Sequence, residues 1–180
     1  MEFFAYQQSD IPEIQALFHQ TFADSEGEAE GKIIGELAAE LLTRTPQEDL
    51  YCFVAKNENN KELAACIIFS RIQFEQPVTA FILSPVAVLT PYQGQGIGQK
   101  LIRFGLDKLR QDGVELAFTY GDPSFYYQVG FEQIPETHIK APQPLSYPIG
   151  WLAQSLTEAA VPHIPGKSSC VPALNNAEYW

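Results

Sequence analysis

Cysteine and histidine are scarce in this chain, with three of each among 180 residues. The cysteines, Cys52, Cys66 and Cys170, are odd in number and far apart, and no two of them form a C-x-x-C pair. This pattern argues against a disulfide framework and a zinc-binding cluster, so we expect reduced, mostly buried thiols and a cytoplasmic protein. The histidines, at positions 19, 138 and 163, lack metal-ligand spacing, and we predict no metal site.

Long apolar runs and basic residues are also missing. No stretch approaches the roughly 20 apolar residues of a membrane span, and the first four residues lack the basic region of a secretory signal. Eleven basic against 22 acidic residues give a formal net charge of −11. A nucleic-acid-binding face needs a stripe of Lys and Arg, so we predict neither a nucleic-acid nor a membrane partner. The negative charge mildly favours an amine as partner, although solubility alone explains it equally well.

Apolar residues make up 46% of the chain, which is typical of a globular protein with a packed core. We find no internal repeat and predict a single domain over residues 1–180. In the first half, the patterns predict a strand at 3–6 and a helix with Asp10 as N-cap and Pro12 in its first turn. They further predict an acidic loop at 24–30, a helix over 33–42, and a hairpin of strands at 50–55 and 63–69.

The stretch from 78 to 111 is the most informative part of the sequence. A predicted strand at 78–89 contains Pro85, which has no N–H for a strand ladder and implies a bulge or an edge. A loop with glycines at 94, 96 and 98 follows, and then a helix to Gln111 that Asp112-Gly113 ends. Strand, glycine loop and helix together favour phosphate binding, because the first N–H groups of a helix have no partner within it.

Two common phosphate motifs do not fit this loop. A P-loop requires Lys followed by Ser or Thr, which is absent after Gly98, and a dinucleotide fingerprint starting at Gly94 would need glycine where Gln99 stands. What remains is Gln93-x-x-Gly96-x-Gly98. A bare glycine-rich turn before a helix is the alternative.

A second motif comes after a half-buried strand predicted at 114–120. Asp122 and Pro123 favour the start of a short helix, and Gly130 favours its end within Phe125-Tyr126-x-x-x-Gly130-Phe131. The two motifs, in this order, resemble the signatures of the GNAT superfamily of acyl-CoA-dependent N-acyltransferases, and in particular a bacterial subgroup of small N-acetyltransferases. The clear resemblance covers about residues 50–133. The Pro-rich segment 134–180 is predicted to be irregular, with a short helix near 150–156, a terminal strand, and Trp151, Tyr179 and Trp180 holding it down.

The resemblance implies an α/β GNAT fold, with a central mixed, mostly antiparallel sheet, splayed strands 4 and 5, and flanking helices. It implies acetyl-CoA as cosubstrate, with the diphosphate on the glycine loop and the pantetheine arm along the fourth strand. The cofactor-binding residues would then be Val86, Ala87, Val88, Gln93, Gly94, Gln95, Gly96, Ile97, Gly98, Gln99 and Tyr126. Tyr126 would also be the catalytic acid that protonates the leaving thiolate.

The activity implied is direct transfer of acetyl from acetyl-CoA to a primary amine, of a small molecule or a protein, in a ternary complex. Many GNAT enzymes carry a glutamate on the fourth strand as base, but residues 78–89 contain no carboxylate. A water relay remains, or a carboxylate from Glu26, Glu28, Glu30, Glu75 or Asp122. The missing base also keeps open a non-catalytic acyl-CoA-binding module. Exposed strands in this fold often pair, which allows a homodimer.

Overall fold

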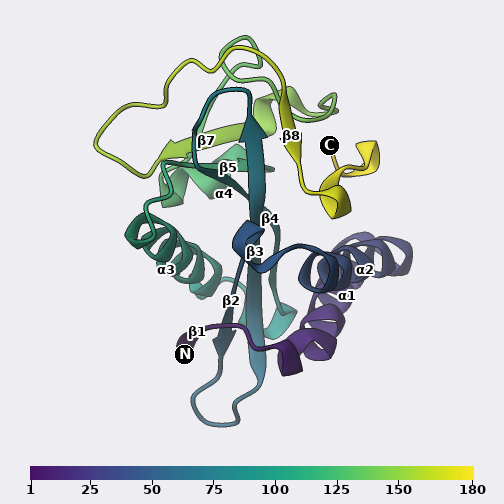
Figure 1. Cartoon of the computed structure of the whole chain (residues 1–180). Coiled ribbons are helices and arrows are strands. Elements are labelled where there is room, and N and C mark those ends of the chain that lie inside the picture. Colours follow the sequence, from purple (N-terminus) through teal and green to yellow (C-terminus); the bar gives the residue numbers. More distant parts are fainter. The chain divides into compact units, whose positions relative to one another are not determined.

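The computed structural model describes residues 1–180 (Figure 1). The chain forms two compact units. The first unit comprises Met1–Phe69 and Pro85–Gly105, and the second comprises Ser70–Ser84 and Leu106–Trp180. No helix combines the length and the apolar character needed to cross a membrane.

In the first unit the strands follow the order β1-β2-β3-β4. Their bounds are β1 (Glu2–Ala5), β2 (Leu50–Lys56), β3 (Leu63–Phe74) and β4 (Ala80–Val88), of which β3 and β4 continue into the second unit. β1 runs antiparallel to β2, and the turn between β2 and β3 is closed by the Asn57 N–H donating to the Glu62 carbonyl at 2.9 Å. The predicted first strand and hairpin are therefore confirmed.

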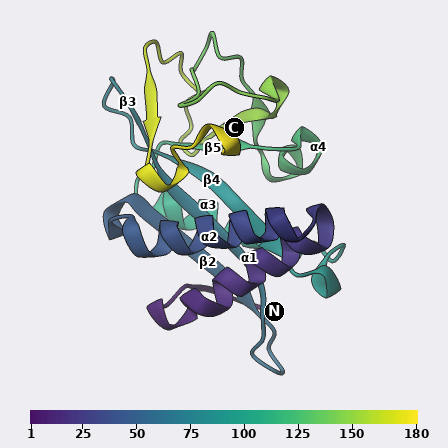
Figure 2. The same ribbon diagram turned by 90° about the vertical axis from the view of Figure 1, so that its right-hand side faces the viewer.

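Two helices, α1 (Ile11–Glu26) and α2 (Glu28–Arg44), lie side by side in the first unit (Figures 1 and 2). Gly31 and Gly35 allow the two helices to approach closely because glycine has no Cβ. A Cβ added at Gly31 would lie 2.5 Å from the His19 carbonyl oxygen, and one added at Gly35 would lie 3.1 Å from the Gln15 carbonyl oxygen. The predicted acidic loop at 24–30 is wrong. Both helices extend into it, and only Gly27, at φ 101°, separates them. Glutamate is a good helix former on an exposed face, so the charge run does not break the helices.

Asp10 occupies the N-cap position of α1, as predicted, but its side chain makes no capping hydrogen bond. Asp10 has helical dihedrals (φ −81°, ψ −13°) and closes a short 3₁₀ turn, Gln8–Asp10, that leads into α1. Its carboxylate accepts the Gln7 N–H at 2.8 Å and pairs with Lys56 at 2.9 Å. The aspartate therefore anchors the entry to α1 against β2 and does not satisfy the first turn of the helix.

Helix α3 (Ile97–Gln111) agrees closely with the prediction. Its apolar face is buried, through Leu101, Ile102, Leu106 and Leu109. Gly113, at φ 80°, supplies the left-handed residue that ends the helix. Within the first unit, the ring of Phe69 packs directly against the backbone of Gly105. A Cβ added at Gly105 would lie only 2.8 Å from Phe69 Cε2, so a larger residue would not leave room for this ring.

In the second unit the order is β3-β4-β5-β7-β6, with β8 paired to β3. β5 (Leu116–Tyr120) runs parallel to β4, whereas β7 (Trp151–Ser155) is antiparallel to both β5 and the two-residue β6 (Glu132–Gln133). β8 (Ser168–Cys170) is antiparallel to β3. The mixed, mostly antiparallel sheet confirms the predicted fold class, but the helix predicted near 150–156 is wrong. Trp151, Leu152 and Ala153 are all buried, so β7 lacks the alternation that marks a half-exposed strand.

The C-terminal segment is held by tryptophan. Trp151 is fully buried, donates its Nε1–H to the Ile139 carbonyl at 2.9 Å and stacks on Phe118 at 5.1 Å. Trp180 packs edge-on against Trp151 at 6.1 Å and donates its Nε1–H to the Leu174 carbonyl at 3.0 Å. The predicted anchoring by these two residues is confirmed. The segment also contains a strand, as expected, which is β8, and two 3₁₀ turns follow it at the end of the chain.

Candidate functional site

The glycine loop has a backbone that only glycine adopts readily. Gly94 and Gly96 both lie at φ 72°, in the left-handed region. A Cβ added at either would meet no atom within 4 Å, so the conformation, and not crowding, requires glycine there. Residues 93–96 are exposed, while Ile97 and Gly98 at the start of α3 are buried.

The loop presents a group of unpaired backbone donors. The first helical hydrogen bond of α3 is Lys100 N–H to the Gly96 carbonyl, at 3.1 Å. No acceptor in the chain pairs with the N–H groups of Gly94, Gln95, Gly96, Ile97 and Gly98. These donors lie at the amino-terminal end of a 15-residue helix, where the dipole favours negative charge. The arrangement suits an anion with several acceptor oxygens.

Two glutamine side chains brace this loop from within. Gln93 donates its Nε2–H to the Val88 carbonyl at 2.8 Å, and Gln95 donates to the Pro91 carbonyl at 3.1 Å. The first bond links the motif glutamine directly to the end of β4. The sequence motif predicts Gln93 as a cofactor-binding residue. It does not predict that the Gln93 side chain also forms a hydrogen bond within the protein, to the Val88 carbonyl.

Two further residues hold the turn before the loop. Thr90 donates its hydroxyl to Asp24 Oδ2 at 2.6 Å, which ties the turn to the end of α1. Tyr92 donates its hydroxyl to Glu62 Oε2 at 2.7 Å and accepts from Asn57 Nδ2 at 3.2 Å. Neither role could be predicted from the sequence, because the partners lie far away along the chain.

β4 changes its pairing near Pro85. The parallel ladder with β5 runs from Ala80–Leu116 to Leu83–Thr119 and ends there, although β4 continues to Val88. Leu89 N–H donates to the Ala64 carbonyl at 2.9 Å. Because backbone direction alternates along a strand, Val86 and Val88 direct their N–H and C=O groups away from that neighbour. The first unit thus brings residues 86–88 and 93–99 together through the bond from Gln93 to Val88.

Tyr126 belongs to the second unit and ends the short helix α4 (Pro123–Tyr126). Asp122 caps this helix as predicted, its Oδ1 accepting the Ser124 N–H at 2.9 Å, and Gly130 ends the next 3₁₀ turn at φ 93°. The ring of Tyr126 packs edge-on against Phe125 and Phe131, with centroids 5.0 Å and 5.8 Å away.

The hydroxyl of Tyr126 is held in its neutral form. Burial raises the pKa of Tyr126 above its usual value near 10, and the Asp122 carboxylate raises it further. A hydrogen bond with the Thr119 hydroxyl opposes the increase. Thr119 itself donates its hydroxyl hydrogen to the Leu83 carbonyl at 2.9 Å. Burial remains the largest influence on the pKa of Tyr126, so the net change is upward. Tyr126 is therefore a hydrogen-bond donor throughout the neutral pH range.

The carboxylates considered as a base have other surroundings. Asp122 accepts from both the N–H and the hydroxyl of Ser124, Glu28 contacts His19 at 2.7 Å, and Glu75 accepts the Lys167 N–H at 3.5 Å. Glu26 is exposed and Glu30 half-buried near the α1–α2 junction. No buried, unpaired carboxylate stands out among them.

Comparison with known proteins converges on one family. The Acetyltransferase (GNAT) domain model matches residues 48–133. The uncharacterized N-acetyltransferase YjhQ of Escherichia coli strain K12 is 32% identical over 128 residues, which are 68% of this chain and 70% of that protein. The uncharacterized N-acetyltransferase YhbS of the same strain is 29% identical over 126 residues, 68% of each chain.

Solved structures agree in fold. The crystal structure of Escherichia coli YhbS in complex with CoA superposes with a TM-score of 0.78 at 24% identity, over 97% of this chain and 92% of that one. A GNAT family acetyltransferase from Brucella melitensis in complex with acetyl-CoA gives a TM-score of 0.69 at 25% identity, over 96% of this chain and 97% of that one.

Proposed function

This chain belongs to the GNAT family of acetyltransferases, and we propose that it transfers an acetyl group from acetyl-CoA to a primary amine by direct attack in a ternary complex. The observation that carries the proposal is the set of five unpaired N–H groups at residues 94–98, at the amino-terminal end of α3. The acceptor is either a small molecule or a protein amino group.

The glycine loop fits the diphosphate of coenzyme A. Each N–H bond to a charged acceptor contributes about 1.5–3 kcal/mol, so the loop needs no Lys or Arg of its own, and residues 93–99 contain none. The open space above Gly94 and Gly96 leaves room for phosphate oxygens to approach the backbone. Gln93 and Gln95 would keep the loop in this shape before the cosubstrate arrives.

We propose that residues 86–88 of β4 pair with the amide-rich pantetheine arm as an added strand would. Val88 already accepts a hydrogen bond from Gln93 at its carbonyl. The arm would therefore use the N–H and C=O of Val86 and the N–H of Val88.

Tyr126 is proposed to donate its hydroxyl hydrogen to the sulfur as the thioester breaks. A tyrosine at pKa 10 would protonate a thiolate of pKa near 8.5 uphill by about 2 kcal/mol, and the raised pKa of Tyr126 increases this cost. Full proton transfer ahead of bond cleavage is thus unfavourable. A neutral hydroxyl can still stabilise the developing negative charge by hydrogen bonding, and this is the role we assign.

The amine must lose a proton before it attacks, at a cost of about 4 kcal/mol at pH 7 for a pKa near 10. β4 offers no carboxylate, and Asp122 is already engaged with Ser124. We propose a water relay, with positioning of the two substrates supplying most of the rate.

The proposal is tested first by cosubstrate binding. At a hundred times its Kd, acetyl-CoA adds about 2.7 kcal/mol of stability, which raises the Tm of a chain of this size by about 5–10 °C. Gly96→Glu should abolish the shift by placing a carboxylate among the donors. Gly113→Glu is the matched control, since Gly113 also has positive φ and open space, and it should retain the shift. An unshifted wild type at millimolar acetyl-CoA would rule out the cosubstrate.

A non-catalytic acyl-CoA-binding module is the second candidate, favoured by the missing carboxylate in β4. Release of free coenzyme A thiol separates the two functions. An enzyme releases thiol from acetyl-CoA at a rate that depends on the amine offered, whereas a binding module shows the Tm shift with no amine-dependent release.

A further inference from the structure

Three large apolar side chains of the second unit are exposed to solvent. Tyr127, Tyr147 and Ile149 keep 50%, 47% and 49% of their surface accessible. Tyr127 directly follows Tyr126 in the chain, and Ile149 belongs to the 3₁₀ turn Pro148–Gly150 that comes after Tyr147. A single exposed apolar residue is common on any protein, whereas a group of them beside an active-site residue can mark a ligand surface.

A pair of glycines connects Tyr147 to Tyr126. The ring of Tyr126 rests on Gly121, as an added Cβ there would lie 2.8 Å from its Cε2 atom. The ring of Tyr147 rests on Gly150, where an added Cβ would lie 2.7 Å from its Cδ1 atom. Gly121 donates its N–H to the Gly150 carbonyl at 3.0 Å. Because backbones paired in this way are about 4.8 Å apart, the two tyrosine rings are near neighbours.

The segment that carries Tyr147 and Ile149 is fixed to the end of β5. Tyr120 accepts the Tyr147 N–H at its hydroxyl, at 2.6 Å, and Gly150 donates its N–H to the Tyr147 carbonyl at 2.8 Å. The ring of Tyr120 in turn stacks on Trp180, with centroids 6.0 Å apart. These contacts hold the segment in place before a ligand arrives, so binding requires little further ordering.

This surface offers apolar contact and no charge. Residues 141–156 contain no Asp, Glu, Lys or Arg, although the whole chain carries a formal charge of −11. A ligand gains here by removing hydrocarbon from water and by packing a ring against Tyr147, and it finds no partner for an ion pair. The surface therefore recognises the uncharged part of a substrate and not an ammonium group.

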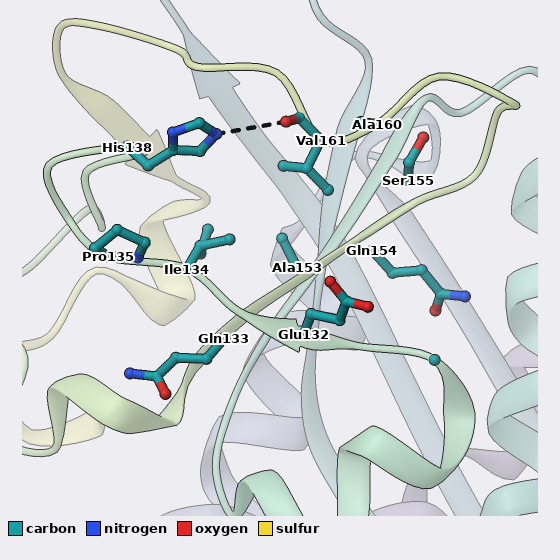
Figure 3. A pocket seen from close by; sticks show the side chains of 11 residues that line it. Glu132, Gln133, Ile134, Pro135, His138, Ala153, Gln154, Ser155, Ala160 and Val161 are labelled. Atoms are coloured by element: carbon teal, nitrogen blue, oxygen red, sulfur yellow. Dashed lines mark hydrogen bonds between the residues drawn. The ribbon is translucent and has the colours of Figure 1, made fainter.

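A cavity of about 530 Å³ in the same unit is not part of this surface (Figure 3). Residues of β6 and β7 line it, among them Glu132 and Gln154. Neither Tyr126 nor any residue that packs against its ring belongs to that lining. The contacts of Tyr126 thus lead to the segment at 147–150 and not to this cavity.

We propose that Tyr147 and Ile149 bind an apolar, preferentially aromatic, substituent of the acceptor while its nitrogen attacks the thioester beside Tyr126. The inference rests on the proposed acetyl transfer and narrows its acceptor to amines that carry an apolar group a few bonds from the nitrogen. A hydrophilic substituent would leave both side chains in water and gain nothing from them.

The experiment compares 2-phenylethylamine with ethanolamine, two primary amines of similar basicity that differ in carrying a phenyl or a hydroxyl group. Thiol release from acetyl-CoA gives kcat/KM for each amine. Calorimetric titration of each amine into protein saturated with coenzyme A gives its Kd without turnover. The wild type should prefer 2-phenylethylamine about tenfold or more in both measurements, because burial of an apolar side group is worth at least this factor.

Four variants locate the preference. Tyr147→Ala should lower both kcat/KM and affinity for 2-phenylethylamine about tenfold while leaving ethanolamine unchanged. Ile149→Asn, which is similar in size, should lower them severalfold, and Tyr147→Phe should keep the preference because it keeps the ring. Phe4→Ala is the matched control, since it removes a ring that is 45% exposed from the first unit, and it should behave as the wild type does. The acetyl-CoA Tm shift should persist in all four.

Equal affinity for the two amines, or a preference that survives in Tyr147→Ala, overturns the inference. A calorimetric preference without any amine-dependent thiol release would refute the proposed acetyl transfer and leave the surface as the binding site of the apolar group. Sedimentation of the wild type as a dimer that Tyr147→Ala dissociates would assign the surface to a second copy of the chain, which also overturns the inference.

Discussion

Gly121 lies against the ring of Tyr126. The substitution Gly121→Ala, which adds a single methyl group, therefore tests the proposed role of that tyrosine. A Cβ at Gly121 would lie 2.8 Å from Tyr126 Cε2, closer than side-chain atoms tolerate. Gly121 does not have a positive φ, so Gly121→Ala strains no backbone. Its N–H donates to the Gly150 carbonyl at 3.0 Å and fixes the position of the new methyl group. The ring must therefore move.

The size of the movement sets the expected effect. Ordinary contact begins at 3.4 Å, so the ring must shift by at least 0.6 Å from its 2.8 Å position. A misplacement of about 1 Å can cost about a hundredfold in rate, and we expect Gly121→Ala to lower kcat about tenfold. Overpacking should also cost about 1–3 kcal/mol of unfolding free energy. Because acetyl-CoA is proposed to bind mainly through the first unit, the Tm shift it causes should persist.

The matched control is Gly105→Ala. Its Cβ would also lie 2.8 Å from an aromatic Cε2 atom, that of Phe69, but in the core of the first unit. Overpacking there is partly offset by the better helix propensity of alanine, which is worth about 0.5–1 kcal/mol. The assay is release of coenzyme A thiol, with kcat expressed per folded protein after a urea titration of each variant. If Gly121→Ala keeps the wild-type kcat, or if Gly105→Ala loses kcat to the same extent, ring position is not what controls turnover.

Three other predictions concern single groups of the second unit. Tyr126→Phe should lower kcat while leaving the acetyl-CoA Tm shift intact, and unchanged thiol release would remove Tyr126 from the mechanism. Asp122→Asn should keep both the helix cap and the activity, whereas Asp122→Ala should lose about 0.5–2 kcal/mol of unfolding free energy in urea; loss of activity in the Asn variant would identify Asp122 as the base. Burial raises the pKa of the Cys170 thiol to about 11. The folded protein therefore keeps the thiol proton at a pH where the unfolded chain has released it. The contribution of Cys170 to the free energy of unfolding is thus lost as the pH rises from about 9 towards 11. Urea titrations of wild type and Cys170→Ala across this range should converge at high pH, and parallel curves would contradict the shift.

Helix α3 and the start of helix α4 could be predicted because their signals are local. The apolar period of α3 and its end at Gly113 depend on neighbouring residues alone, and so does the cap that Asp122 provides for α4. Other features depend on distant partners. Asp10 resembles an N-cap in the sequence, but Lys56 and the Gln7 N–H occupy its carboxylate.

The strand β7 and the continuous helices at 24–30 escape prediction for a related reason. Trp151–Ser155 forms a strand because β5 pairs with one of its edges and β6 with the other. The sequence of these five residues alone does not indicate such pairing with distant segments. The charge of the acidic run at 24–30 suggests a loop, whereas the propensity of glutamate and the single break at Gly27 decide the structure. The brace from Gln93 to Val88 likewise depends on a fold that already brings the loop back to β4.

The contact between Gly31, Gly35 and the His19 turn has a practical consequence for protein engineering. In a randomised library across α2, substitutions at these two positions should mostly give variants that do not fold. Even a methyl group at Gly31 would lie 2.5 Å from the backbone of the other helix. Ile33 and Lys32 lie between them in sequence, are exposed to solvent and accept any residue that tolerates a helix. Selection for a new surface on this pair should therefore diversify the outward positions and leave the two glycines untouched.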